Sequence, residues 1–288
     1  MAIQLNTLVD TPLDYPGDVE RVEIDALTGA IFEYYGFDFR MYATSSLKRR
    51  LWKFAEEEGL KTLSALQETI LHDGAAMERL LAVLSVKVTS MFRDPGFYRS
   101  FREHVIPLLR TYPSVRIWHA GCASGEEVYS MAILLREEGL LAGSRIYATD
   151  LNQEAVRRAR AGIYPIDRMQ EYTRNYIDAG GKRAFSDYYT ASHDSVKMDP
   201  TLVRDVVFAQ HDLATDHSFA EVNALICRNV LIYFNRDLQD RVHEIFHATL
   251  VPFGILALGA KESLRATRWA RAYVTLDDRY KIYRKVPS

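Results

Sequence analysis

One stretch constrains the fold more than any other, residues 116–150, which read RIWHAGCASGEEVYSMAILLREEGLLAGSRIYATD. Alternating apolar residues over 116–120 predict a strand, the glycine-bounded segment 121–125 predicts a turn, and the spacing over 126–138 predicts a helix. A second strand then ends on Asp150. This order of elements is typical of a nucleotide-binding βαβ unit.

Two residues of this unit suit a nucleoside-like ligand. Gly121 allows the backbone to approach a ligand closely, because glycine has no Cβ. The carboxylate of Asp150 can accept two hydrogen bonds from the hydroxyls of a ribose. Glycine turns between a strand and a helix also arise for steric reasons alone, so the stretch favours a bound ligand but does not identify it.

Length and charge limit the classes of protein to which this chain can belong. With 288 residues, it is long for one domain and comfortable for two. Its formal net charge of −2 provides no overall field toward nucleic acid or an acidic membrane. The two cysteines, Cys122 and Cys227, lie far apart in the sequence, which fits a reducing compartment. The N-terminus lacks a signal-peptide pattern, and no apolar run approaches the roughly 20 residues that span a bilayer. We therefore expect a cytoplasmic protein that neither binds nucleic acid nor inserts into a membrane.

The apolar pattern divides the chain into three parts. Residues 1–20 have little periodicity and are predicted to be a tail, whereas 21–88 have the three- and four-residue spacing of a small domain of four helices. Residues 89–288 alternate strands and helices, which predicts an α/β domain with a parallel sheet. Within it, residues 163–204 are too long and irregular for a plain connection, so we expect an inserted β-subdomain or lid.

Polar residues gather where successive strands of the predicted sheet end. Further strands are predicted over 205–213, 224–229, 254–259 and 280–286, and a helix over 235–250. Glu126, Asp150, Asp212 and Asn229 then lie at or just after the carboxyl ends of strands. Open α/β sheets bind their ligands at this edge, so these residues form the candidate site.

The junction between the two domains is a second candidate region. Asp94 and Pro95 form a good helix start, with a side-chain acceptor at the N-cap and a preset φ at the next position. The predicted helix continues to Leu109. Thr89 and Arg93 therefore lie just before this helix, at a domain boundary of the kind where ligand sites are common. An interdomain salt bridge is the alternative role for Arg93.

The candidate site shows neither a metal cluster nor a nucleophile of its own. His243 and His247 are four residues apart on a predicted helix, but they lack the H-E-x-x-H pattern of a zinc site, and we expect them on an exposed face. Two enzyme classes remain, hydride transfer with a dinucleotide and methyl transfer from S-adenosylmethionine. Glu126 and Glu127 would repel a pyrophosphate at the helix start, but they suit a sulfonium ligand with an α-amino group.

Four segments carry a resemblance to a known family. They are 89–93 (TSMFR), 121–130 (GCASGEEVYS), 227–234 (CRNVLIYF) and 259–263 (GAKES). In this order they resemble the motifs of the CheR family, the chemoreceptor glutamate O-methyltransferases of bacteria, over roughly Leu47 to the C-terminus. The resemblance implies an N-terminal helical domain, a class I methyltransferase domain with a Rossmann-like sheet and a small inserted β-subdomain. It also implies methyl transfer from S-adenosylmethionine to glutamate carboxylates of methyl-accepting chemoreceptors, with S-adenosylhomocysteine as product and no metal.

The resemblance also implies roles for single residues. The implied cofactor contacts are Lys87, Thr89, Arg93, Gly121, Glu126, Asp150, Asp212, Leu213, Asn229 and Val230. Tyr233 matches a tyrosine near the transferred methyl group, and we expect it to orient the incoming carboxylate together with Arg93. Lys87 and Asp212 stand where the family commonly has asparagine, and Met91 replaces a phenylalanine. These departures bear on cofactor affinity rather than on the reaction.

A basic helix face is the expected docking site for the receptor. At about 100° per residue, Arg49, Arg50 and Lys53 fall on one side of a predicted helix. A solvated face is the commoner reason for such a pattern, whereas the family uses a basic helix of this domain to bind acidic receptor helices.

The expected β-loop at 190–201 is short and lacks a glycine-rich tip. We therefore expect an enzyme that does not depend on a C-terminal receptor pentapeptide. We also expect it to be a monomer.

Three alternatives stay open at this point. The chain could methylate another protein or a small molecule, bind the cofactor without turnover, or be a dinucleotide oxidoreductase. The joint presence of Thr89, Arg93, Asn229 and Tyr233 argues against the second alternative. The Glu126–Glu127 pair argues against the third.

Overall fold

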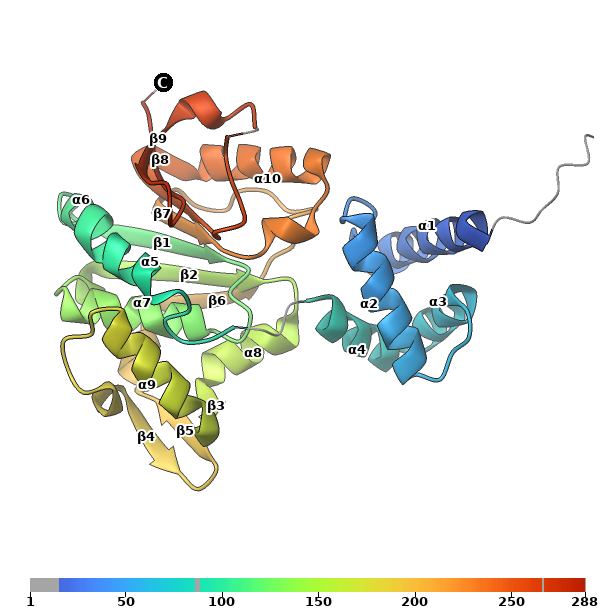
Figure 1. The fold of residues 1–288 in the computed structure, drawn as a ribbon, viewed down its shortest axis with the longest axis horizontal. Coiled ribbons are helices and arrows are strands. Elements are labelled where there is room, and N and C mark those ends of the chain that lie inside the picture. Colours follow the sequence, from blue (N-terminus) through green and yellow to red (C-terminus); the bar gives the residue numbers. More distant parts are fainter. Residues whose placement is uncertain (1–15, 86–88, 266, 288) are drawn as a thin grey trace, which may run out of the picture.

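The computed structural model describes residues 16–85, 89–265 and 267–287, which fold into a helical domain and an α/β domain (Figure 1). Lys87 lies outside the described residues, so its contact with the cofactor stays a prediction. None of the helices in the described ranges is long and apolar enough to cross a bilayer.

The helical domain packs its helices around an aliphatic core, as their spacing predicts. The helices are α1 (Pro16–Tyr35), α2 (Thr44–Glu57), α3 (Leu63–His72) and α4 (Gly74–Leu84). Leu27, Leu51 and Leu66 are fully buried where these helices meet. Helix α1 begins at Pro16, so the last residues of the predicted tail 1–20 are helical.

The α/β domain is built on a seven-stranded sheet in the order β6-β2-β1-β7-β8-β10-β9. Its strands are β1 (Val115–Ala120), β2 (Ser144–Asp150), β6 (Val206–Gln210), β7 (Val222–Cys227), β8 (Leu250–Leu258), β9 (Tyr273–Asp277) and β10 (Ile282–Lys285). The pairs from β6 to β8 are parallel, whereas β10 is antiparallel to both β8 and β9. The prediction of a parallel sheet is therefore wrong at its C-terminal end, where no strand was expected at β9. The short connection 278–281 permits a hairpin but not a parallel crossover.

Helices cover both faces of this sheet, and the sheet separates two hydrophobic cores. They include α7 (Glu126–Glu137), α8 (Gln153–Ala161) and α10 (Arg236–Thr249). Because side chains alternate along a strand, Ile117 packs in the core with α7 and Trp118 packs in the core with α10. Helix α10 also buries His243, and desolvation lowers the pKa of this histidine to about 4. The prediction that His243 lies on an exposed face is wrong.

The predicted helix from Pro95 to Leu109 is interrupted. It consists of α5 (Pro95–Ser100), a π-helical turn η1 (Phe101–Val105) and α6 (Ile106–Leu109). Pro107 cannot donate a backbone hydrogen bond and its ring crowds the preceding turn, which accounts for the wider turn there. Asp94 stands at the N-cap of α5, but its side chain makes no capping hydrogen bond. The predicted cap is wrong because this carboxylate forms a long-range ion pair with Arg228 instead.

A small antiparallel sheet in the order β3-β5-β4 lies between α8 and β6 in the sequence. Its strands are β3 (Ile163–Pro165), β4 (Tyr189–Ser192) and β5 (Ser195–Met198). The expected inserted β-subdomain is therefore present in the structure. This segment also contains α9 (Met169–Asp178), where the sequence predicted irregular chain.

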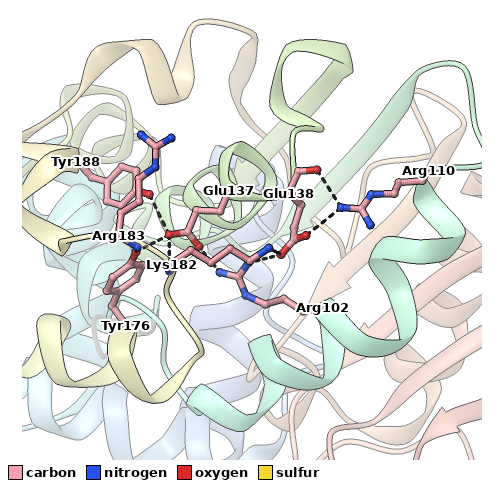
Figure 2. A network of polar contacts seen from close by, with 8 residues as sticks. All are labelled: Arg102, Arg110, Glu137, Glu138, Tyr176, Lys182, Arg183 and Tyr188. Carbon is pink, nitrogen blue, oxygen red and sulfur yellow. Dashed lines mark hydrogen bonds and ion pairs between the residues drawn. The ribbon is translucent and has the colours of Figure 1, made fainter.

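A polar network joins this inserted segment to the α/β domain (Figure 2). At the end of α7, the side chain of Glu137 is fully buried. It accepts hydrogen bonds from the backbone N–H of Lys182 and the hydroxyls of Tyr176 and Tyr188. Arg102 forms an ion pair with the same carboxylate. A buried charge with this many partners fixes the insertion in one position.

The two domains meet beside the loop that follows β7. Tyr42 of the helical domain forms an antiparallel bridge with Phe234, and their rings lie 5.0 Å apart. Close to the end of β2, Asn152 Nδ2 donates a hydrogen bond to Ser85 Oγ at 2.9 Å. The helical domain is thereby held over the carboxyl ends of the parallel strands.

Candidate active site

A cavity of about 950 Å³, including its open mouth, lies between the helical domain and the carboxyl ends of the parallel strands. This volume is within the range of small-ligand sites. Most of the predicted site residues line it, namely Thr89, Arg93, Gly121, Asp150, Asp212, Leu213, Asn229, Val230 and Tyr233. The structure thus brings together residues from four separate strand ends and from the domain junction.

Asp150 provides a rigid acceptor at the end of β2. One carboxylate oxygen accepts a hydrogen bond from Ala123 N at 2.8 Å, and the other accepts one from Asn152 N at 3.0 Å. Burial raises the pKa of Asp150, and these two hydrogen bonds oppose the rise. Because a carboxylate has about four lone-pair sites, both oxygens retain capacity for a donor in the cavity. The arrangement fits the paired hydroxyls of a ribose.

Only glycine fits at position 121, because of its backbone conformation and because Val230 lies close to it. Its φ is +80°, which favours glycine, and a Cβ there would lie 2.4 Å from Val230 Cγ2. The glycine turn and the loop after β7 are therefore in direct contact, and a larger residue would push them apart.

The pKa of Asp212 is higher than that of an ordinary surface aspartate. Burial raises its pKa to about 6, while a hydrogen bond from Ala214 N opposes the rise and the charge of Asp216 adds to it. Its Oδ1 accepts the Ala214 hydrogen bond at 2.8 Å. With Leu213 beside it in the cavity wall, Asp212 presents a polar acceptor and an apolar surface together, which suits a nucleobase.

The two carboxylates at the start of α7 point to different places. Glu126 is buried away from the cavity, with a hydrogen bond from Ser124 Oγ at 2.7 Å and a longer contact with Tyr172. Glu127, not Glu126, lines the cavity. Neighbouring helical side chains diverge by about 100°, so only one of the pair can face the strand ends. The predicted role of Glu126 as a cofactor contact requires it to lie at the cavity wall. The structure does not place it there.

Glu127 belongs to a buried ion-pair network that the sequence analysis did not recognise. Its carboxylate lies 3.0 Å from Arg228 Nη1 and 3.0 Å from His119 Nδ1. Burial alone would raise the pKa of Glu127, but His119 and Arg228 outweigh this effect and keep the pKa below its usual value. Arg228 Nη2 also binds Asp94 at 2.6 Å. Glu127 therefore brings a compensated charge to the cavity, which weakens the argument that the pair would repel a pyrophosphate.

Arg93 lies in a loop with an uncommon backbone. Its neighbours Phe92 and Asp94 both have positive φ, 51° and 57°, a conformation that costs on the order of 1–3 kcal/mol for a residue other than glycine. Phe92 N is held by Ser130 Oγ at 2.8 Å, and Asp94 is held by Arg228. The surrounding contacts therefore fix the loop that carries Arg93 to the cavity wall.

Arg50 reaches the cavity rim rather than a free basic face. Its guanidinium lies 4.2 Å from the centre of the Tyr233 ring and also binds the carbonyl oxygen of Leu84. Arg49 and Lys53 are exposed on α2, where Lys53 pairs with Glu57 at 3.7 Å. The three residues predicted to form one docking surface are thus separated in the structure, with Arg50 turned toward Tyr233.

Two further residues of the cavity wall, Arg228 and Tyr42, were not predicted from the sequence. Arg228 directly follows an apolar strand. A charged residue in that position is a signal of a functional site, and the sequence analysis could have used it. Tyr42 also lines the cavity, where burial and the charges of Asp212 and Asp150 raise its pKa. Nothing in the local pattern around Tyr42 points to the cavity, because only domain packing places it there.

The described ranges contain no group of three or more histidine, cysteine, aspartate or glutamate side chains arranged to bind a metal ion.

Two family models match the chain. The model described as "CheR methyltransferase, SAM binding domain" matches residues 87–277, and "CheR methyltransferase, all-alpha domain" matches residues 23–85. Together they cover the inserted segment, most of the helical domain and all strands of the large sheet except β10.

Curated relatives agree with these matches. A Pseudomonas putida protein, provisionally named methyltransferase Cher3, is 48% identical over 264 residues, which cover 92% of this chain and 97% of the relative. The chemotaxis protein methyltransferase 1 of Pseudomonas aeruginosa is 31% identical over 241 residues, covering 78% of this chain and 83% of the relative.

Proposed function

The chain belongs to the CheR methyltransferase family and is an S-adenosylmethionine-dependent methyltransferase, and we propose that it methylates glutamate side chains of methyl-accepting chemoreceptors. The products are glutamate methyl esters and S-adenosylhomocysteine. The observation that carries the proposal is one cavity lined by acidic residues after β2 and β6 and by Arg93 and Tyr233 near the end of β7. The first set suits a cationic nucleoside, and the second suits a carboxylate.

The reaction needs no general base from the protein. A glutamate side chain has a reference pKa of about 4.3, so its carboxylate is ionised and nucleophilic at neutral pH. The bound cofactor supplies a methyl group already activated by its sulfonium. What the chain's own residues add is position and partial exclusion of water, and proximity of this kind can contribute several kcal/mol to a rate.

Arg93 and Tyr233 are the residues that we assign to the carboxylate of the substrate. Arg93 offers a guanidinium and Tyr233 a hydroxyl at the cavity wall. Arg93 must not bind the carboxylate too tightly, because a strong bidentate pair would stabilise the ground state more than the transition state. Arg50, stacked on the Tyr233 ring, restricts where the hydroxyl can point.

We assign the acidic side of the cavity to the cofactor. Asp150 would accept from the ribose hydroxyls, and Asp212 with Leu213 would face the adenine. Gly121, Asn229 and Val230 would shape the space between them. The buried acceptors and the required glycine support this assignment, which needs no metal ion.

The partner surface is proposed to be the exposed part of α2. Arg49 and Lys53 lie there and would attract the acidic methylation helices of a receptor. The β4–β5 hairpin turns through only His193 and Asp194, which supports activity without a receptor C-terminal pentapeptide. We place this reaction in the cytoplasm and assign it to a monomer.

The test is methyl transfer from S-adenosylmethionine labelled in its methyl group to cytoplasmic fragments of chemoreceptors. We expect label on the receptor that alkali releases as methanol, because carboxylate esters hydrolyse readily in base. Fragments with glutamine at the methylated positions should take up no label, and removal of the C-terminal pentapeptide should leave the rate unchanged. Label that resists alkali would contradict the proposal and favour another acceptor. Cofactor binding without transfer would favour a non-catalytic relative.

A further inference from the structure

A buried carboxylate lies beneath the loop that follows β7 and has no part in the proposed chemistry. Glu262 is 4% exposed. Its Oε2 accepts hydrogen bonds from Gly259 N at 2.5 Å and Asn229 N at 3.0 Å, and its Oε1 accepts one from Val230 N at 2.8 Å. One side chain therefore joins the end of β8 to the end of β7.

The surroundings of Glu262 leave little room for another arrangement. A Cβ at Gly259 would lie 2.7 Å from Glu262 Oε2 and 2.8 Å from Asn229 N, so only glycine allows the two loops to approach this closely. Burial raises the pKa of Glu262, while the backbone N–H groups oppose the rise. A desolvated carboxylate of this kind is costly to bury unless its acceptors are satisfied, so the site is built around these donors.

The loop that Glu262 holds bears three residues of the cavity wall. Asn229 has a positive φ of 63°, a conformation that asparagine tolerates but that still needs support. Val230 packs against Gly121 on the opposite loop. Tyr233 ends the 3-10 turn η6 (Leu231–Tyr233), which follows directly. A shift of this loop would change both the cofactor side and the substrate side of the cavity.

We propose that Glu262 is a positioning residue for methyl transfer, which touches neither cofactor nor substrate but presets the loop 229–233 for cofactor binding. Its carboxylate acts on Asn229 and Val230 through their backbone N–H groups. The inference rests on the cofactor site named above, but not on which carboxylate receives the methyl group. Binding of S-adenosylhomocysteine measures it without any methyl acceptor.

Glu137 provides a matched control within the same chain. Its side chain is also fully buried and also accepts a backbone hydrogen bond, from Lys182 N at 2.9 Å. It joins α7 to the inserted segment (Figure 2). It is absent from the cavity wall. A glutamine at either position replaces one acceptor oxygen with an amide that cannot accept. Both substitutions remove a buried acceptor, and Glu137→Gln also removes the ion pair with Arg102, so the control disturbs the fold at least as much but in a different place.

The experiment compares Glu262→Gln and Glu137→Gln by calorimetric titration with S-adenosylhomocysteine and by urea unfolding. We expect both variants to lose stability. Only Glu262→Gln should raise the Kd of the folded protein for S-adenosylhomocysteine, by about 10-fold, because one buried donor is left without its acceptor. The KM for S-adenosylmethionine should rise by a similar factor. Equal Kd values for Glu262→Gln and wild type would overturn the proposal, as would an equal rise in Glu137→Gln.

Glu262→Asp keeps the inference testable if the glutamine variant does not fold. It retains the charge but withdraws the carboxylate by one methylene, so the hydrogen bonds to the loop lengthen. We expect a Kd between those of wild type and Glu262→Gln, and an unchanged Kd would again overturn the proposal.

Discussion

On the side of β2 and β6 the cavity presents the carboxylates of Asp150 and Asp212, whereas on the side of β7 it presents the guanidinium of Arg228 and the ring of Tyr233. The carboxylates are held by backbone N–H groups close to them in the sequence, such as Asn152 N and Ala214 N. The groups on the β7 side are held by side chains from distant segments.

This difference separates two ways of building a site. Asp150 takes its place from the turn and strand that carry it, so its role follows from a local motif. Arg228 depends on Asp94 and Glu127, and Tyr233 depends on Arg50 from the helical domain. The position of Asp150 is thus a property of the βαβ unit, whereas Arg228 depends on the tertiary packing of the α/β domain and Tyr233 on the packing of the two domains.

Replacement of Arg93 should give the largest effect and tests the substrate side. We expect Arg93→Ala to lower kcat by roughly 100-fold, because misplacing a reacting group by about 1 Å can cost this much. The Kd for S-adenosylhomocysteine should change little. Single-turnover kinetics and calorimetry measure the two quantities, and an unchanged kcat would remove Arg93 from the mechanism.

Replacement of Asp150 should give the opposite pattern. We expect Asp150→Ala to raise the Kd for S-adenosylhomocysteine by roughly 50-fold, since hydrogen bonds to a charged group contribute about 1.5–3 kcal/mol each. With saturating cofactor, kcat should recover most of its wild-type value. Calorimetry provides the Kd, and a variant that loses kcat but not affinity would contradict the division between the two sides.

Asp212→Asn should stabilise the protein without ligand at neutral pH. The pKa of Asp212 is raised to about 6 in the folded protein, whereas an aspartate in an unfolded chain titrates near pH 4. The folded state therefore binds the proton more tightly, and the ionised group destabilises the fold above pH 6. This penalty decreases as the pH falls from 6 toward 4. We expect a gain of about 2 kcal/mol at pH 7.5 that vanishes near pH 4, measured by urea unfolding; an equal gain at both values would exclude this titration as the cause.

Charge reversal on α2 should have the smallest effect and separates docking from catalysis. We expect Arg49→Glu with Lys53→Glu to raise the KM for the receptor about 5-fold at low salt, with less effect at high salt, because exposed charges are screened. The Kd for the cofactor should not change.

Arg50→Ala should instead lower kcat, since Arg50 contacts Tyr233. A pure KM effect in Arg50→Ala would return this residue to the docking surface.

Much of the fold could be predicted because its signals are local. The glycine turn, the helix α7 and the end of β2 at Asp150 all lie within one continuous stretch, and the structure confirms them. The break before α6, the helix α9 and the antiparallel β9–β10 hairpin were missed. Each of these depends on short segments whose packing outweighs a weak local pattern.

The candidate site divides in the same way. Motif spacing placed Thr89, Arg93 and Asn229 in the cavity wall, where the structure has them. It could not distinguish Glu126 from Glu127, because that choice depends on the rotation of α7 against the sheet. It also could not show that Arg50 turns toward Tyr233. The sequence of α2 does not show which surface of the α/β domain packs against this helix.

The sequence by itself determined a βαβ unit with a glycine turn and a terminal acid, since backbone conformation and hydrogen bonds between near neighbours specify both. Only the tertiary structure decided which carboxylate faces the cavity, that Arg228 links Glu127 to Asp94, and that Glu262 holds the loop after β7. The physical reason is distance along the chain. These contacts join residues far apart in sequence, and their geometry is set by how the helices and strands pack, which no local pattern contains.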